Sequence, residues 1–124
     1  MGLVGFWDIL RVAAMSAATK ALSGMSLEEA ARTAPRQTGV YKLYLDGKLM
    51  KVGKAEWEGG IRWRMQQYWR GDHTAGISEP EISANRGRVR VVWSLVAVEG
   101  CRELEVQMID LAGGISNLAW CHRR

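Results

Sequence analysis

The chain has 124 residues, of which 48% are hydrophobic, with a net charge of +4 and a pI of about 9.4. This length predicts one compact domain, and the hydrophobic fraction excludes a disordered chain. The basic balance favours a polyanionic partner without proving one.

The first part of the chain is predicted to be helical. Apolar residues recur at helical spacing over residues 3–22, and three charged residues interrupt them, so we expect no membrane span there. Ser26 and Glu29 form a capping box for a second helix from Leu27 to about Thr33. We treat residues 1–37 as an N-terminal helical segment that covers one face of a sheet or contacts a partner.

A β-hairpin is predicted over residues 39–53, because two β-rich runs flank the Asp46-Gly47 turn signal. A two-residue loop would place Tyr41 opposite Val52. A three-residue loop would place Tyr41 opposite Lys51, on the same face of the sheet. We favour the three-residue loop.

The rest of the chain reads as one further strand and two helices. Apolar spacing and turn residues predict a helix over Ile61–Arg70, a long loop over 71–88 and a strand over Val89–Val98. A second helix is predicted from Cys101 to about Ala112, with an apolar stripe formed by Leu104, Met108 and Leu111. A short tail over Ile115–Trp120 follows it. The predicted fold is α+β: a small three-stranded antiparallel sheet flanked by helices, with the extra N-terminal helical segment.

Cysteine and histidine usage argues against a zinc site. Cys101 and Cys121 are far apart, and His73 and His122 complete no ligand cluster. We expect two free thiols, as is usual in a reducing compartment, and hence a protein that acts in the cytoplasm.

The two ends of the hairpin carry a family signature. The first run opens with Gly39-Val40-Tyr41, and the second closes with Lys51-Val52-Gly53, with Tyr41 and Lys51 ten positions apart. This pattern resembles the start of a GIY-YIG nuclease domain in which lysine replaces the second tyrosine. The resemblance covers about residues 38–118 and assigns a nuclease domain to residues 38–124.

Other family roles follow in the same order. The resemblance places the family's arginine on Arg64, its tyrosine on Tyr68, its glutamate on Glu105, and its asparagine on Asn117, twelve positions after Glu105. Arg62 competes for the phosphate-clamp role from a different helix face. Glu103 is the alternative carboxylate and fits the spacing less well.

The resemblance implies metal-dependent hydrolysis of phosphodiester bonds. Glu105 would hold Mg²⁺, or another divalent cation such as Mn²⁺, and Arg64 would bind the scissile phosphate. Tyr41 is the implied general base, with its pKa lowered by Lys51 and the metal. The expected catalytic residues are Tyr41, Lys51, Arg64, Tyr68 and Glu105, and the expected substrate-binding residues are Gly39, Gly53, Lys54, Arg62 and Asn117.

Each of these residues also has a structural interpretation. Tyr41 fits a packed strand residue, Lys51 a solvated strand lysine, and Glu105 a solvated helix carboxylate. Arg64 and Tyr68 share a helix face and fit a stacking pair. Asn117 fits a cap, and the glycines fit strand ends.

The leading functional hypothesis is a DNA endonuclease, either a toxin effector delivered into a target cell or a standalone phage or restriction-type enzyme. The alternatives are a non-catalytic nucleic-acid-binding module of the same fold and an RNA-cleaving nuclease. A toxin would have an acidic immunity protein that covers the cleft of Tyr41 and Arg64. Arg86, Arg88 and Arg90 are expected either to track a phosphate backbone or to be solvated.

Overall fold

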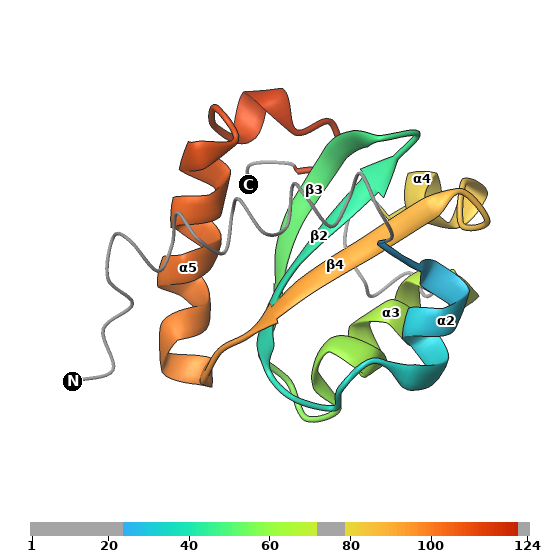
Figure 1. The fold of residues 1–124 in the computed structure, drawn as a ribbon, viewed down its shortest axis with the longest axis horizontal. Helices are drawn as coiled ribbons and strands as arrows, with labels where there is room; N and C mark the ends of the chain where they lie inside the picture. The colour runs from blue at the N-terminus through green and yellow to red at the C-terminus, as the bar shows by residue number, and fades with distance from the viewer. Residues whose placement is uncertain (1–23, 72–78, 122–124) are drawn as a thin grey trace.

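The computed structural model describes residues 24–71 and 79–121 (Figure 1). The helix predicted over residues 3–22 and both histidines lie outside the described residues. The strands are β1 (Met25–Ser26), β2 (Gly39–Leu45), β3 (Lys48–Ala55) and β4 (Val89–Leu95). The helices are α2 (Leu27–Thr33), α3 (Gly60–Arg70), α4 (Glu79–Ala84) and α5 (Val98–Leu111), followed by a 3₁₀ turn, η2 (Ile115–Asn117).

The α+β class is confirmed, but the sheet has four strands rather than three. All of its strand pairs are antiparallel, in the order β1-β4-β2-β3. The additional strand β1 pairs Met25 with Val91 and Ser26 with Arg90 at the outer edge of β4. Two residues are too few to show an alternating pattern, so β1 could not be predicted from the sequence.

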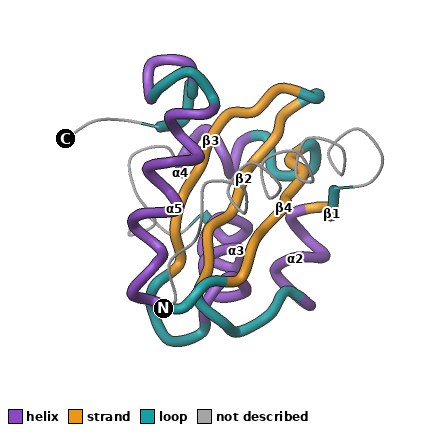
Figure 2. The backbone as a smooth tube through the Cα atoms, turned by 60° about the vertical axis from the view of Figure 1, so that its left-hand side comes forward, coloured by secondary structure: helices purple, strands orange, loops and turns teal. Residues whose placement is uncertain are grey.

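Helices cover both faces of the sheet. α5 packs on one face against β2 and β3, and α2 and α3 lie on the opposite face (Figures 1 and 2). Val40 and Val52 belong to the core under α5, whereas Tyr41 and Leu43 belong to the core under α2 and α3. Because adjacent residues of β2 point to opposite faces, this central strand is buried on both sides.

The predicted helix Leu27–Thr33 is confirmed as α2. The Ser26 side chain accepts a hydrogen bond from the Glu29 backbone N–H at 3.1 Å, as the capping box predicts. The helix buries Leu27 and Ala30 against the sheet and α3. None of the helices in the described part of the chain is long and apolar enough to cross a membrane.

The predicted hairpin register is wrong. Asp46 (φ 51°) and Gly47 (φ 84°) form a two-residue turn, so Leu45 pairs with Lys48. An irregularity after Leu43 then shifts the pairing by one residue, consistent with a β-bulge. Tyr41 therefore lies opposite Gly53 and not opposite Lys51.

Lys51 nevertheless remains on the face of the sheet that carries Tyr41. It pairs with Leu43, two positions along β2 from Tyr41, and residues two apart on a strand share a face. The two residues therefore share a face of the sheet, as predicted, although they do not lie opposite one another.

Three element boundaries also differ from the prediction. The segment predicted as a loop contains α4 in its described part. β4 ends at Leu95, three residues early, and α5 begins at Val98 rather than Cys101. Leu111, assigned to the apolar stripe of α5, is 47% exposed, whereas Leu104 and Met108 are buried.

Candidate active site at the edge of β3

Two tyrosines from different elements form the centre of the candidate site. The hydroxyls of Tyr41, on β2, and Tyr68, on α3, lie 2.5 Å apart and share a hydrogen bond. Their rings are packed edge to face, with centroids 6.0 Å apart. Tyr41 is 2% exposed and Tyr68 1% exposed, so the pair is enclosed by protein.

Gly53 makes room for the Tyr41 ring. A Cβ atom at position 53 would lie 2.4 Å from the Tyr41 hydroxyl oxygen and 2.5 Å from Cζ. The phenol therefore crosses the backbone of β3, which is the last strand on that side of the described sheet. The Tyr41 hydroxyl reaches the sheet edge in this way.

Both phenols are harder to ionise than a free tyrosine. Burial, together with the neighbouring Tyr68, raises the pKa of Tyr41 well above its ordinary value of 10.0. Burial also raises the pKa of Tyr68 to about 12, although the hydrogen bond shared with Tyr41 and the charge of Arg64 lower it. Both side chains are neutral phenols at neutral pH.

The charge of Arg64 lowers the pKa of Tyr41, against the larger effect of burial. The expected effect of Lys51 on Tyr41 stays a prediction. Arg64 lies one helical turn before Tyr68, and its charge acts on both phenols.

The two arginines of α3 differ in what they contact. The Arg62 Nε donates to the Ala34 carbonyl at 2.6 Å, which ties α3 to the end of α2. The Arg64 Nε is buried and finds no hydrogen-bond partner within residues 24–71 and 79–121. Arg64 thus keeps donor capacity for an anion, whereas Arg62 is committed to the fold.

Glu105 is a half-buried carboxylate on α5, across the sheet from α3. Burial raises the pKa of Glu105, and Lys54 and Lys51 partly oppose that rise. Its charge acts on Tyr41 and Tyr68 as well, which places it near the same edge of the sheet. Glu103 is exposed and accepts from Gln107 at 3.4 Å, so Glu105 is the better candidate ligand.

The Glu105 carboxylate fits a hard divalent cation. Its raised pKa shows that the two lysines do not fully compensate its negative charge. No group of three or more His, Cys, Asp or Glu side chains gathers in the described residues. A cation held by Glu105 would therefore draw its remaining ligands from water and substrate oxygens, as Mg²⁺ commonly does.

The two lysines of β3 approach the edge from opposite faces. Lys51 shares the face of Tyr41, and its ammonium donates to the Trp120 carbonyl at 3.2 Å. Lys54 shares the face of Val40, under α5, and forms an ion pair with Glu56 at 2.8 Å. Both lie close enough to Glu105 to lower its pKa.

Two predicted substrate-binding residues have packing roles. A Cβ atom on Gly39 would lie 2.4 Å from the Ser94 carbonyl oxygen, so β4 fills the space beside this glycine. The Asn117 amide donates to the Ala112 carbonyl at 3.1 Å and so caps the end of α5. The contacts of both residues agree with their structural interpretations.

Arginines on and before β4 are also bound by the protein. Arg86 donates to the Trp69 carbonyl at 2.7 Å, Arg88 pairs with Asp46, and Arg90 donates to the Gly24 carbonyl. All three arginines are also exposed, as expected for a solvated strand edge, and the phosphate track stays a prediction.

Sequence analysis missed the segment of residues 118–121 as part of the site. The Trp120 backbone N–H donates to the Met50 carbonyl at 2.9 Å, and the Cys121 thiol lies 3.5 Å from the Val52 carbonyl oxygen. The segment therefore runs beside β3. The apolar run Leu118-Ala119-Trp120 is a sequence signal that this stretch packs against the rest of the protein.

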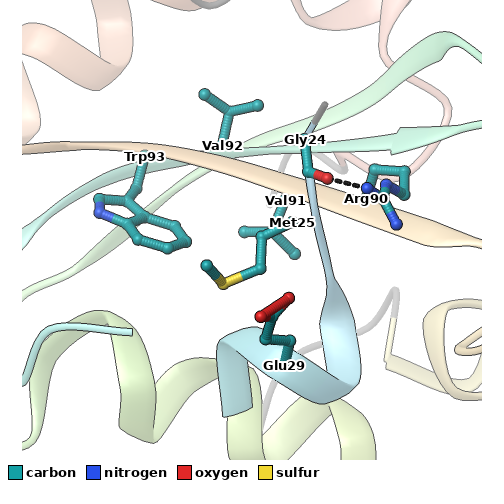
Figure 3. A pocket seen from close by; sticks show the side chains of 7 residues that line it. All are labelled: Gly24, Met25, Glu29, Arg90, Val91, Val92 and Trp93. Atoms are coloured by element: carbon teal, nitrogen blue, oxygen red, sulfur yellow. Dashed lines mark hydrogen bonds between the residues drawn. The ribbon is translucent and has the colours of Figure 1, made fainter. Parts of the chain in front are cut away.

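A cavity of about 560 Å³ lies near the opposite edge of the sheet, between β4 and α2 (Figure 3). It is lined by Gly24, Met25, Glu29, Arg90, Val91, Val92 and Trp93. Trp93 pairs with Tyr41, so the cavity opens on the face of the tyrosines but on the far side of β2 from β3. Its lining holds one carboxylate and no phenol, and we assign it no part in the site.

The chain was also compared with known protein families, proteins and structures. Protein-family models, curated proteins and solved structures give no match to this chain. Functional inference therefore depends on the geometry at the edge of β3 and on the motif resemblance.

Proposed function

We propose that this protein is a metal-dependent endonuclease of the GIY-YIG type that hydrolyses phosphodiester bonds in DNA. One observation carries the proposal. Tyr41 and Tyr68 share a hydrogen bond, and Arg64 and Glu105 both act on that pair. Four residues singled out by the motif thus converge from three elements at one sheet edge.

Each side chain has a chemical role in the proposal. Arg64 binds the scissile phosphate through charge-assisted hydrogen bonds. Glu105 would hold Mg²⁺ or Mn²⁺, which when bound supplies charge neutralisation at the phosphate and an acidified water. Lys51 and Lys54 add positive charge on either side of Glu105.

The two tyrosines act as a pair in the proposal. Either hydroxyl can donate the hydrogen bond that the two phenols share. Burial raises the pKa of both side chains, so a proton acceptor in this pair needs nearby positive charge, which Arg64 supplies to both. We keep Tyr41 as the proposed general base and assign to Tyr68 the positioning of Tyr41.

A non-catalytic nucleic-acid-binding module is the second candidate. The burial of Tyr41 and its raised pKa favour this function, because an enclosed neutral phenol is a poor base at neutral pH. In such a module Arg64 would retain phosphate binding without turnover.

The edge of β3 also bears on whether the nuclease is a standalone enzyme or a toxin with an immunity protein. Either a standalone nuclease acting in the cytoplasm or a delivered toxin agrees with the proposal. Because Tyr41 is only 2% exposed, an acidic immunity protein could not contact it directly. Such a partner would instead cover the edge of β3 with carboxylates facing Lys51 and Lys54.

The first test is nicking of supercoiled plasmid with Mg²⁺ and with EDTA, using Arg64→Met and Arg62→Met as a matched pair. We expect Mg²⁺-dependent nicking, reduced about a hundredfold or more in Arg64→Met because a phosphate contact is lost. Arg62→Met should nick normally but lose about 1 kcal/mol or more of stability with its hydrogen bond to Ala34.

The outcomes separate the candidates. Equal loss of nicking in both variants would contradict the role of Arg64. Salt-sensitive DNA binding without nicking by the wild type would establish the binding module. Cleavage of RNA but not DNA would change the proposed substrate and leave the proposed phosphodiester hydrolysis in place.

A further inference from the structure

The segment of residues 118–121, which we call the strap, crosses the edge of the sheet. Leu118 is buried in the core under α5, and Trp120 is buried in the core under α2 and α3. The two cores lie on opposite faces, so the chain between these residues passes around the outer edge of β3. Figure 1 shows this terminal stretch returning from the end of α5 to β3.

Hydrogen bonds hold the strap against three consecutive residues of β3. The Trp120 N–H binds the Met50 carbonyl, the Lys51 ammonium binds the Trp120 carbonyl, and the Cys121 thiol approaches the Val52 carbonyl. The next residue along β3 is Gly53, which the Tyr41 phenol crosses. Cys121 is also close enough to Tyr68 to influence it electrostatically.

This placement conflicts with an open active site. The strap lies along β3 directly beside Gly53, which the Tyr41 phenol crosses, and both tyrosines are at most 2% exposed. It also occupies the Lys51 ammonium, one of the two cations beside Glu105. A closed site of this kind needs one part to move before substrate binds.

We propose that the strap is an autoinhibitory closure of the active site, displaced from the edge of β3 when nucleic acid binds. The inference rests on the proposed function, because it takes nucleic acid as the ligand. Displacement removes the Trp120 indole from the core, frees the Lys51 ammonium for a phosphate, and opens the path to Tyr68 and Arg64. Leu118 remains anchored under α5 as the fixed end.

The Cys121 thiol lies in the strap, so its chemical reactivity can measure strap opening. Cys121 is half-buried, Cys101 in the first part of α5 is fully buried, and both are free thiols. Labelling with a small maleimide, followed by mass spectrometry of the two cysteine peptides, measures strap opening at Cys121. The Cys101 peptide reports global unfolding in the same sample.

We expect a DNA oligonucleotide in EDTA to accelerate labelling of wild-type Cys121 about tenfold, with Cys101 unchanged. Trp120→Ala should accelerate it without DNA and raise kcat/KM for nicking, because less of the protein is closed. Trp57→Ala, which truncates a 67% exposed tryptophan, should change neither quantity.

Two results would overturn the closure. One is DNA binding that leaves Cys121 labelling unchanged or slower. The other is a folded Trp120→Ala protein with wild-type labelling and nicking rates. If Trp120→Ala fails to fold, the wild-type comparison decides alone. Absence of any DNA binding would instead refute the proposed function, and it is read from the binding titration.

Discussion

Replacing Glu105 with glutamine is expected to abolish cleavage and, at neutral pH, to stabilise the fold. Cleavage should fall by about 10²–10³-fold or more, because the site loses the carboxylate that we propose holds the cation. The stability gain follows from burial, which raises the pKa of Glu105 even though Lys54 and Lys51 lower it. Glutamine keeps the shape and removes the buried charge.

The pH dependence of stability checks the sign of this effect. The folded protein holds the Glu105 proton to a higher pH than the unfolded chain, whose carboxyl titrates near 4.5. Wild-type stability therefore falls as pH rises from that value through the raised pKa, and the loss persists at pH 7. The variant lacks this loss, so the two unfolding curves should converge at acid pH and separate at pH 7.

Urea denaturation at pH 4 and pH 7 measures the difference, with Glu103→Gln as the matched control on the same helix. Glu103 is exposed, so its variant should retain both cleavage and wild-type stability. A Glu105→Gln protein that still cleaves with Mg²⁺ would remove Glu105 from the metal site. A variant less stable than wild type at pH 7 would show that the carboxylate has a compensating partner.

Local signals in the sequence predicted most of the fold. The capping box at Ser26 and the turn at Asp46-Gly47 depend on residues near one another in the chain, and both features formed. The register of the hairpin did not follow from its turn, because the irregularity after Leu43 shifts the pairing farther along the strand. β1 forms because the edge of β4 is available for pairing. A short stretch of sequence around residue 25 contains no information on that distant strand.

The motif predicted which residues belong to the candidate site. It did not predict how deeply they are buried, and burial decides their pKa values. The resemblance named Tyr41, Arg64 and Tyr68, and in the structure the two tyrosine hydroxyls share a hydrogen bond. The same residues gave no hint that both phenols would be enclosed with raised pKa values. Enclosure depends on the strap, whose return to β3 is a contact between residues about 70 positions apart.

Substituting alanine for Gly53 should damage the site more selectively than any change to a charged residue. The new Cβ atom would overlap the Tyr41 hydroxyl and Cζ, so the phenol has to leave its position over β3. Its hydrogen bond to Tyr68 is then lost, and overpacking costs about 1–3 kcal/mol. We expect nicking to fall about a hundredfold, because a positioning contact in the catalytic pair is removed.

Gly87→Ala is the matched control, because a Cβ atom there meets nothing within 4 Å and the residue lies in an exposed turn. A double-mutant cycle with Tyr41→Leu isolates the cause: the alanine at 53 should cost much less stability once the ring is gone. Additive losses would mean that Gly53 acts through the β3 backbone and not through Tyr41. Losses that are not additive would show that Gly53 acts through the Tyr41 ring. If Cys121 labelling is also faster in Gly53→Ala, the position of the Tyr41 phenol is linked to strap closure, because the phenol and the strap contact neighbouring residues of β3.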